Sequence, residues 1–386
     1  MKKKDARKKK GRVSRNSSGH GAIATMGEWT LEEILSQPET WRETARRTAQ
    51  QSGLIEISQL QAAEPWLFVA CGSSYYLSRT IASLWSLLLP TPCTAVPASE
   101  LLIAPDDLLK RTGARRAVLI SRSGKTTEVL RAAKWLASRR GIETLGVTCN
   151  ASSELEKVCA HTLKLPWADE KSMVMTRSFT TILLVFQRLV AKLAGDASLR
   201  ATLDALPENA ERWLAGNAAK IRAFGTTRQF ADYVFLGQSA HCWLAHEAAL
   251  KVTEMSSSYA QAYHTLEFRH GPKTIASRDT LITFLLSDAG AMEEVPLIGE
   301  LKRLGAATMV VANRATADLR RDSDLLIELG LEEPEYARLA LTAIPAQLLG
   351  LAVGLRKGLN PDTPKNLTRA VVLDGSEDVS AKRRSA

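Results

Sequence analysis

The chain has 386 residues, 45% of them hydrophobic and 24% charged, which is typical of a globular protein with one large or two medium domains. The formal net charge of +10 does not indicate a nucleic-acid partner, because residues 1–25 hold nine Lys and Arg against one Asp, leaving only +2 for the rest. The longest apolar stretch, residues 339–355, is interrupted by Thr342, Pro345 and Gln347, so we predict a buried helix and no membrane partner.

The N-terminal segment and the cysteines bear on localisation. Residues 1–25 lack an apolar core, so they do not resemble a secretory signal, and we expect a disordered basic tail. The cysteines show no C-x-x-C pair, which favours reduced thiols in a cytoplasmic protein and gives no metal site or other cofactor: Cys71, Cys93, Cys149, Cys159 and Cys242.

Two parts of the chain repeat one pattern. The apolar run "LFVAC" leads into "GSSYY" and a helical pattern through Leu88, and "YVFL" later leads into "GQSAH" and another helix. The glycines of these junctions, Gly72 and Gly237, are 165 residues apart. A second strand, "AVLI", is followed by "SRSGKTTE", a helix and "TLGVTCN", and its counterpart is "TLITFLLSDAG", a helix and "ATMVVAN". The asparagines that close these units, Asn150 and Asn313, are 163 apart. The two similar offsets indicate a duplicated domain.

Alternating strands and helices predict the fold class α/β, with two tandem, doubly wound parallel-sheet domains of the flavodoxin-like kind. We place them at residues 57–200 and 222–364, after a helical lead-in at 26–56 and before a C-terminal tail at 365–386. Such sheets bind ligands beyond the carboxyl ends of their strands. The loops "GSS" and "SRSGKTT" are therefore expected at a binding site.

Both loops of the first repeat are rich in hydroxyls. Ser73 and Ser74 follow a glycine at one strand-to-helix junction, and Ser121, Ser123 and Thr126 surround Gly124 at another. Hydroxyls and free N–H groups at helix N-termini favour an anion, so we predict a phosphomonoester site, although simple N-capping is the alternative. Neither nucleotide-binding glycine motif is present. In the second repeat "SDAG" replaces "SRSG", and its Asp288 would repel a phosphate.

The stretch from residue 246 to 274 combines acidic and basic side chains. Glu247, Lys251 and Glu254 lie at i, i+4 and i+7, on one side of a predicted helix, and His270 follows about one loop later. The alternative interpretation is a solvated helix face with ion pairs of a few tenths of a kcal/mol each.

The chain resembles the tandem SIS (sugar isomerase) domain family over about residues 27–375. The matching pieces are "TLEEILSQPETW", "ACGSSY", "SRSGKTTE", "EKSMVMTRSFTT", "EAALKVTEMS", "FRHGPK" and "NPDTPKNLTRAVVL". The family includes the isomerase half of glutamine–fructose-6-phosphate aminotransferase and the galactosamine-6-phosphate and tagatose-6-phosphate isomerase/deaminases. "SRSG" and "FRHGPK" favour the isomerase/deaminase branch.

The resemblance implies roles for particular residues. The phosphate-binding positions fall on Ser74, Ser121, Ser123 and Thr126, with Ser73 and Arg122 adjoining, and Met173 falls where a backbone group touches the sugar. Glu254 falls on the catalytic carboxylate, Lys251 on the helix lysine and His270 on the ring-opening histidine. The family's histidine crosses a dimer interface, which implies a homodimer with shared active sites.

Two departures from the family pattern matter. The amidotransferase members carry an N-terminal glutaminase domain, and here that place holds the short basic tail, so we expect no ammonia from glutamine. Those members also form an imine through a lysine near the C-terminus. The matching residue here is Arg369, which stays protonated and cannot form one. Lys365, four residues away, would substitute only if the segment were displaced.

These observations predict an aldose–ketose isomerase/deaminase whose partner is a small phosphorylated amino sugar, with a hexosamine 6-phosphate preferred. Proton transfer between C1 and C2 would be the reaction. Two alternatives stay open: a glutaminase-less relative of glucosamine-6-phosphate synthase acting on fructose 6-phosphate and glucosamine 6-phosphate, and a non-catalytic phosphosugar-binding protein.

Overall fold

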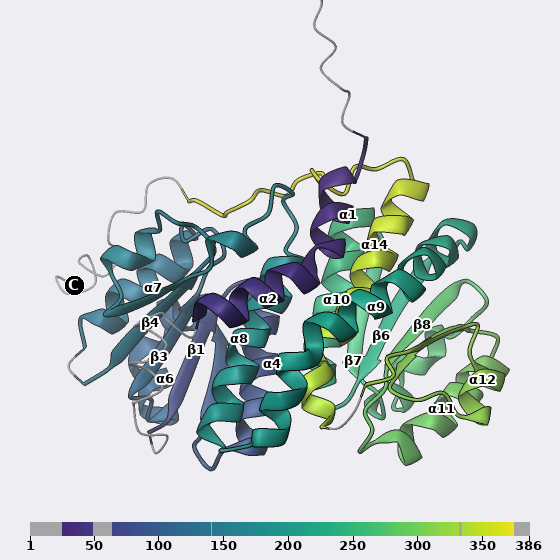
Figure 1. The fold of residues 1–386 in the computed structure, drawn as a ribbon, viewed down its shortest axis with the longest axis horizontal. Coiled ribbons are helices and arrows are strands. Elements are labelled where there is room, and N and C mark those ends of the chain that lie inside the picture. Colours follow the sequence, from purple (N-terminus) through teal and green to yellow (C-terminus); the bar gives the residue numbers. More distant parts are fainter. Residues whose placement is uncertain (1–24, 49–63, 140, 332–333, 374–386) are drawn as a thin grey trace, which may run out of the picture.

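The computed structural model describes residues 25–48, 64–139, 141–331 and 334–373, and these form two α/β domains side by side (Figure 1). Each domain is built on a five-stranded sheet in which all pairs are parallel, so the predicted fold class is confirmed. The predicted N-terminal tail, apart from Thr25, and residues 374–386 of the C-terminal tail lie outside the described residues.

The first sheet has the strand order β2-β1-β3-β4-β5. Its strands are β1 (Trp66–Ala70), β2 (Cys93–Pro97), β3 (Arg116–Ile120), β4 (Glu143–Thr148) and β5 (His161–Lys164). Every residue of β1 is buried, because helices cover both faces of a parallel sheet, and this explains its continuous apolar run. The connecting helices are α4 (Ser73–Leu88), α5 (Ala98–Ile103), α6 (Pro105–Thr112), α7 (Thr127–Ala137) and the short helices η1 (Glu154–Lys157) and η2 (Pro166–Ala168).

The second sheet has the order β10-β9-β8-β6-β7, which is the topology of the first sheet repeated, so the duplication is confirmed. Its strands are β6 (Asp232–Gly237), β7 (Tyr259–His264), β8 (Thr280–Leu285), β9 (Ala307–Ala312) and β10 (Leu325–Glu328). Its helices are α10 (Ala240–Ser256), η3 (Glu267–Arg269), η4 (Pro272–Ile275), α11 (Ala291–Arg303) and α12 (Ala317–Asp322).

One hydrophobic core cluster extends through both domains. The helices that contribute to it besides those that connect the strands are α1 (Glu28–Leu35), α2 (Gln37–Thr48), α8 (Arg177–Leu193), α9 (Ala197–Thr227), η5 (Glu335–Arg338), α13 (Leu339–Thr342) and α14 (Ile344–Arg356). In the described part of the chain, one helical segment, residues 335–356, is long and apolar enough to cross a membrane, but its most apolar window is 94% buried in the fold. The predicted buried helix is therefore confirmed.

Helices α4 and α10 pack against each other and run antiparallel. Lys251 near the end of α10 contacts Ser73 at the start of α4, whereas Trp243 near the start of α10 lies under Arg79, with the guanidinium 3.8 Å from the ring centroid. On its other side α10 packs against α14, where a Cβ on Gly354 would lie 2.2 Å from the carbonyl oxygen of Met255. This packing brings the last turns of α10 to the carboxyl edge of the first sheet.

Candidate active site

The two hydroxyl-rich loops meet at the topological switch point of the first sheet. Strands β1 and β3 are neighbours, and the chain continues from them to opposite sides of the sheet. A crevice at this point is where doubly wound sheets bind ligands. Gly72 begins the first loop and Gly124 lies within the second, with φ of 57° and 65°, values that favour glycine. The loops predicted from the sequence are thus brought together.

The hydroxyls of the second loop face one another. Ser121 Oγ lies 3.0 Å from Thr126 Oγ1 and 3.5 Å from Ser123 Oγ. Thr126 is the N-cap of α7, yet its side chain makes no capping hydrogen bond, and α4 also begins without a side-chain cap. Simple N-capping therefore does not account for these hydroxyls. A helix N-terminus lined by hydroxyls suits a phosphate group.

Two of the three charged side chains in the α10 stripe are buried and the third is largely covered, so the alternative interpretation as a solvated helix face is wrong. Lys251 is 1% exposed and Glu247 2%. Lys251 Nζ donates to Ser73 Oγ at 3.0 Å, lies 3.4 Å from Glu247 Oε1 and forms an ion pair with Glu254. The side chain of Glu254 is 16% exposed and that of Glu247 3%, so Glu254 is the more solvent-accessible of the two carboxylates.

Burial and charge shift the pKa values of Glu247 and Lys251. Burial raises the pKa of Glu247 to about 8, although Lys251 partly opposes the shift. Burial works against the charge of Lys251, but the carboxylates of Glu247 and Glu254 outweigh it and raise the lysine pKa. Lys251 is therefore a cation at neutral pH, with Glu254 as its partner. The resemblance assigned no role to Glu247, and its place on the stripe was the only sequence signal for it.

The segment 169–176 forms a further wall of the site, built on two buried carboxylates. Glu170 accepts from Thr176 N at 2.6 Å, and Glu33 of α1 accepts from Ser172 N at 3.1 Å. The segment also carries Met173, whose N–H donates to Asp362 O at 3.0 Å. Ser74 Oγ reaches the same segment through Met175 Sδ at 3.6 Å. Both carboxylates lie in pieces that match the family, Glu33 in "TLEEILSQPETW" and Glu170 in "EKSMVMTRSFTT", but the resemblance assigned neither of them a role.

Arg122 lies inside the protein, although the resemblance placed it beside the phosphate. Its guanidinium contacts Glu170 and the backbone carbonyls of Met173 and Arg369. Arg369 pairs with Asp169 through its own side chain, with Nη2 2.5 Å from Oδ1. Lys365 is exposed.

His270 lies at the opposite edge of the second sheet from Glu254. Glu254 precedes β7, whereas His270 follows it, and the six residues of β7 span roughly 20 Å. The segment after β7 is held at the carboxyl edge, because Thr265 N donates to Gly237 O at 3.1 Å and Phe268 is fully buried in a separate hydrophobic cluster within the second domain. His270 itself is exposed. Within the described residues, no hydrogen bond or ion pair joins its side chain to Glu254 or Lys251.

The corresponding crevice of the second domain is filled by the chain itself. Ser287 Oγ donates to Glu294 Oε1 at 2.5 Å, and Thr265 Oγ1 donates to Glu294 Oε2 at 2.6 Å. Glu294 is fully buried, and Asp288 pairs with Arg338. The hydroxyls of Ser287, in the "SDAG" loop, and of Thr265, after β7, are thus both bonded to a buried carboxylate.

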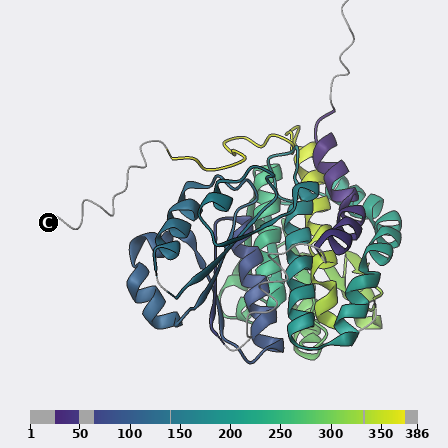
Figure 2. The ribbon, with the colours of Figure 1, turned by 60° about the vertical axis from the view of Figure 1, so that its left-hand side comes forward.

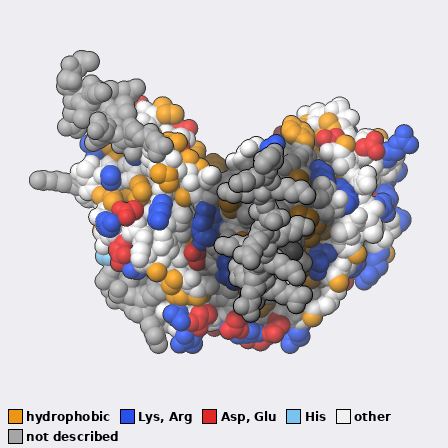
Figure 3. All heavy atoms as spheres, turned by 90° about the horizontal axis from the view of Figure 1, so that it is seen from above, with side chains coloured by type: hydrophobic (Ala, Val, Ile, Leu, Met, Phe, Trp, Pro, Cys, Tyr) orange, Lys and Arg blue, Asp and Glu red, His pale blue; other side chains and the backbone are white. Residues whose placement is uncertain are grey.

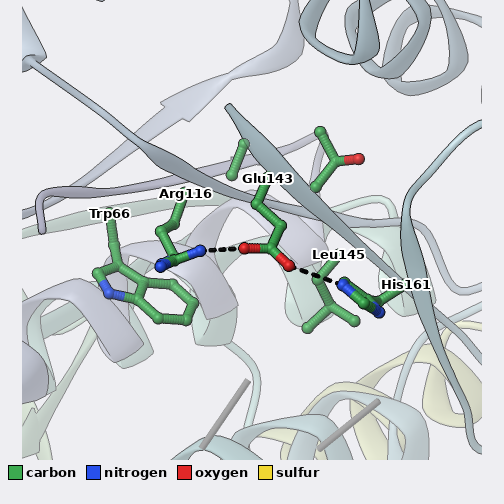
Figure 4. A pocket seen from close by; sticks show the side chains of 7 residues that line it. Trp66, Arg116, Glu143, Leu145 and His161 are labelled. Carbon is green, nitrogen blue, oxygen red and sulfur yellow. Dashed lines mark hydrogen bonds and ion pairs between the residues drawn. The ribbon is translucent and has the colours of Figure 1, made fainter. Parts of the chain in front are cut away.

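Other candidate sites are weak. Figure 4 shows a small pocket at the amino edge of the first sheet, where Glu143 bridges Arg116 and His161, the latter at 2.8 Å. On the face in Figure 3, Lys and Arg side chains are dispersed among acidic and apolar ones. No group of three or more His, Cys, Asp or Glu is placed to hold a metal in the described parts of the chain, which include all five cysteines, each a free thiol.

Comparison with known proteins places this geometry in a family. Residues 59–192 and 232–353 each match the SIS domain. The glutamine–fructose-6-phosphate aminotransferase (isomerizing) of Methanothermobacter thermautotrophicus is 29% identical over 346 residues, which are 89% of this chain and 57% of that protein. Its Pyrobaculum aerophilum counterpart is 28% identical over 369 residues, 91% of this chain and 59% of that protein. The chain therefore spans less than two thirds of the length of these relatives.

Solved structures agree with the family match. A glucosamine-6-phosphate deaminase of Thermotoga maritima is 30% identical with a TM-score of 0.74, covering 89% of this chain and 99% of that one. A tagatose-6-phosphate ketose/aldose isomerase of Escherichia coli shares the fold, with a TM-score of 0.77 at 22% identity over 89% of this chain and 97% of that one. The two sequence matches, and two sheets of identical topology, lead to one conclusion: the chain belongs to the SIS domain family and carries two copies of the domain in tandem.

Proposed function

We propose that this protein is an aldose–ketose isomerase for a phosphorylated sugar, and that its preferred substrate is a hexosamine 6-phosphate, which it deaminates. The observation that carries the proposal is the buried Lys251, which bridges Glu254 and Ser73 at the crevice of the first domain. An acid/base pair thereby lies next to hydroxyl-lined loops suited to a phosphate. The relatives, which include a glucosamine-6-phosphate deaminase and a tagatose-6-phosphate isomerase, support the same substrate class.

The chemistry follows from these positions. Glu254 takes the proton from C2 of the open-chain sugar and returns it to C1, through an enediol or enolamine. Lys251 stabilises negative charge on the enediol oxygen and holds Glu254 in place. The phosphate, bound at residues 121–126, anchors the substrate so that the reacting carbons lie at Glu254. On a 2-amino sugar the proton shift yields an imine at C2, and its hydrolysis releases ammonia and leaves the ketose.

Release of ammonia is favoured over its incorporation because no imine-forming lysine occupies the matching C-terminal position. Arg369 stands there, stays protonated and pairs with Asp169.

The position of His270 supports a homodimer with shared active sites. A whole strand separates His270 from Glu254 within one chain, so we propose that His270 of the partner subunit opens the sugar ring at the Glu254 site. Exchange of protons with the ring oxygen and the anomeric hydroxyl would then occur across the subunit interface.

The test is to incubate the purified protein with glucosamine 6-phosphate, galactosamine 6-phosphate and tagatose 6-phosphate and to assay ammonia and ketose. We expect stoichiometric ammonia and ketose phosphate from one amino sugar. Isomerisation without ammonia would support the synthase-like alternative. Binding of a phosphosugar without turnover would support a non-catalytic binding protein and overturn the proposal.

A further inference from the structure

A buried ion pair lies directly beneath the hydroxyl loop. Arg122 Nη1 is 3.0 Å from Glu170 Oε2, and the two side chains are 5% and 0% exposed. Glu170 also accepts from Ser178 N at 2.9 Å and from Ser178 Oγ at 2.7 Å. Together with Thr176 N, these donors satisfy both carboxylate oxygens of Glu170. The positive charge of Arg122 is therefore neutralised by Glu170 inside the protein.

The second Nη group of Arg122 joins two further segments. It donates to Met173 O at 2.8 Å and to Arg369 O at 3.2 Å, the latter 247 residues away in the sequence. The guanidinium suits this arrangement, because its rigid fork directs Nη1 to the carboxylate and Nη2 to the two carbonyls. The arginine thus links the phosphate loop, the 169–176 segment and the C-terminal segment, defined here as residues 362–373.

The C-terminal segment crosses from the second domain to the first. It leaves the region of α14 and runs along the upper edge of the first domain toward α7 in both views (Figures 1 and 2). Val371 O accepts from Thr127 N at 3.1 Å, and Leu373 N donates to Thr127 Oγ1 at 3.0 Å. Asp362 anchors its start, accepting from Thr30 N at 2.8 Å.

We propose that Arg122 is a positioning residue that fastens the C-terminal segment and Met173 against the phosphate loop, making them a wall of the phosphosugar site, and that it is not a phosphate ligand. Its charge is neutralised by Glu170, and both Nη groups are directed to protein oxygens. Its influence on catalysis rests on the proposed function, whereas its fastening of the C-terminal segment does not.

Arg122→Lys separates the two roles. The lysine keeps the charge that Glu170 requires but loses the fork, so we expect amide hydrogen exchange in residues 365–373 to accelerate about tenfold or more. Affinity for inorganic phosphate, measured by calorimetry, should stay within about twofold, since the hydroxyl loop is intact. KM for the phosphosugar should rise at least about fivefold, because the sugar contacts a loosened wall.

Two comparisons make the result decisive. Arg116→Lys is the matched control. Arg116 begins β3, the strand that leads into the loop of Arg122, so it lies at the opposite edge of the sheet, where it pairs with Glu143 (Figure 4). This control should change neither the hydrogen exchange, nor the phosphate affinity, nor KM. Glu170→Gln should also accelerate amide hydrogen exchange in residues 365–373. If Arg122 were instead a phosphate ligand, removing the charge of Glu170 would release Arg122 and tighten phosphate binding. Weaker phosphate binding in Arg122→Lys, parallel to KM, or unaltered exchange would overturn the proposal. Exchange and calorimetry need no turnover, so failure of the proposed function is distinguishable.

Discussion

Lys251 Nζ donates to Ser73 Oγ at 3.0 Å, although the two residues are 178 positions apart and belong to different domains. The bond joins the third quarter of the chain to the first turn after β1. It exists because α10 lies antiparallel to α4, so that the end of one helix meets the start of the other. The acid/base group of the second domain is thereby presented to the phosphate loops of the first.

Glu254→Gln should reduce kcat by about 10²–10⁴-fold, because it removes the base that moves the C2 proton while keeping the side-chain size. Substrate affinity should change little, since phosphate contacts lie on other residues. NMR in D₂O should show loss of exchange at the substrate C2 hydrogen. The same substitution at Glu293, exposed at the start of α11, should have no effect. Exchange at the native rate in Glu254→Gln would show that another group is the base.

Ser74→Ala combined with Ser123→Ala should raise KM for the sugar phosphate by about one to two orders of magnitude, if each hydroxyl supplies a charge-assisted hydrogen bond of about 1.5 kcal/mol. Ser152→Ala, at an exposed position after β4, is the control. An unchanged KM in the double variant would place the phosphate elsewhere.

Mixing inactive Glu254→Gln protein with inactive His270→Ala protein should restore activity after subunit exchange, because one hybrid site then holds both native groups. About a quarter of the sites are native in a fully exchanged random mixture, since each dimer has two sites and half of the dimers are hybrid. Activity should be measured beside proof of heterodimers by native mass spectrometry. Heterodimers without activity would place each site within one chain.

Glu247 should give the protein a pH-dependent stability. Burial raises its pKa from 4.5 to about 8, so the folded state holds a proton that the unfolded chain has released between these values. The free energy of unfolding should therefore fall as pH rises from about 4.5 to about 8. Glu247→Gln cannot titrate, so its Tm should depend less steeply on pH over this window, whereas Glu293→Gln should follow the native curve. Parallel slopes in all three proteins would contradict a buried, protonated Glu247.

Gly354→Ala should lower the free energy of unfolding by about 1–3 kcal/mol, because the added Cβ would lie 2.2 Å from Met255 O and must push α14 away from α10. Gly216→Ala, inside α9 with no atom within 4 Å of the added Cβ, should raise it by about 0.5–1 kcal/mol. Chemical denaturation measures both. Equal changes in the free energy of unfolding for the two variants would mean that α14 can move away from α10 without destabilising the protein.

The apolar runs, the Gly/Ser junctions and the two offsets in the sequence were sufficient to predict the duplicated parallel fold and the two hydroxyl loops. These features are local: a strand buried on both faces must be apolar along its length, and a tight strand-to-helix turn needs glycine at positive φ. The spacing of Glu247, Lys251 and Glu254 likewise follows from the helical period. Periodicity did not show that this stripe is buried, because its burial depends on the packing of α10 against α4 and α14.

The tertiary structure decided which partners these side chains have. The packing of α4 against α10 brings Ser73 within hydrogen-bonding distance of Lys251. The C-terminal segment places the carbonyl of Arg369 next to Arg122, 247 residues away in the sequence. The connection through β7 places His270 at the far edge of the second sheet from Glu254. Such contacts depend on how helices and sheets are oriented across the whole domain, and no pattern of period 2 or 3.6 within one segment records that orientation.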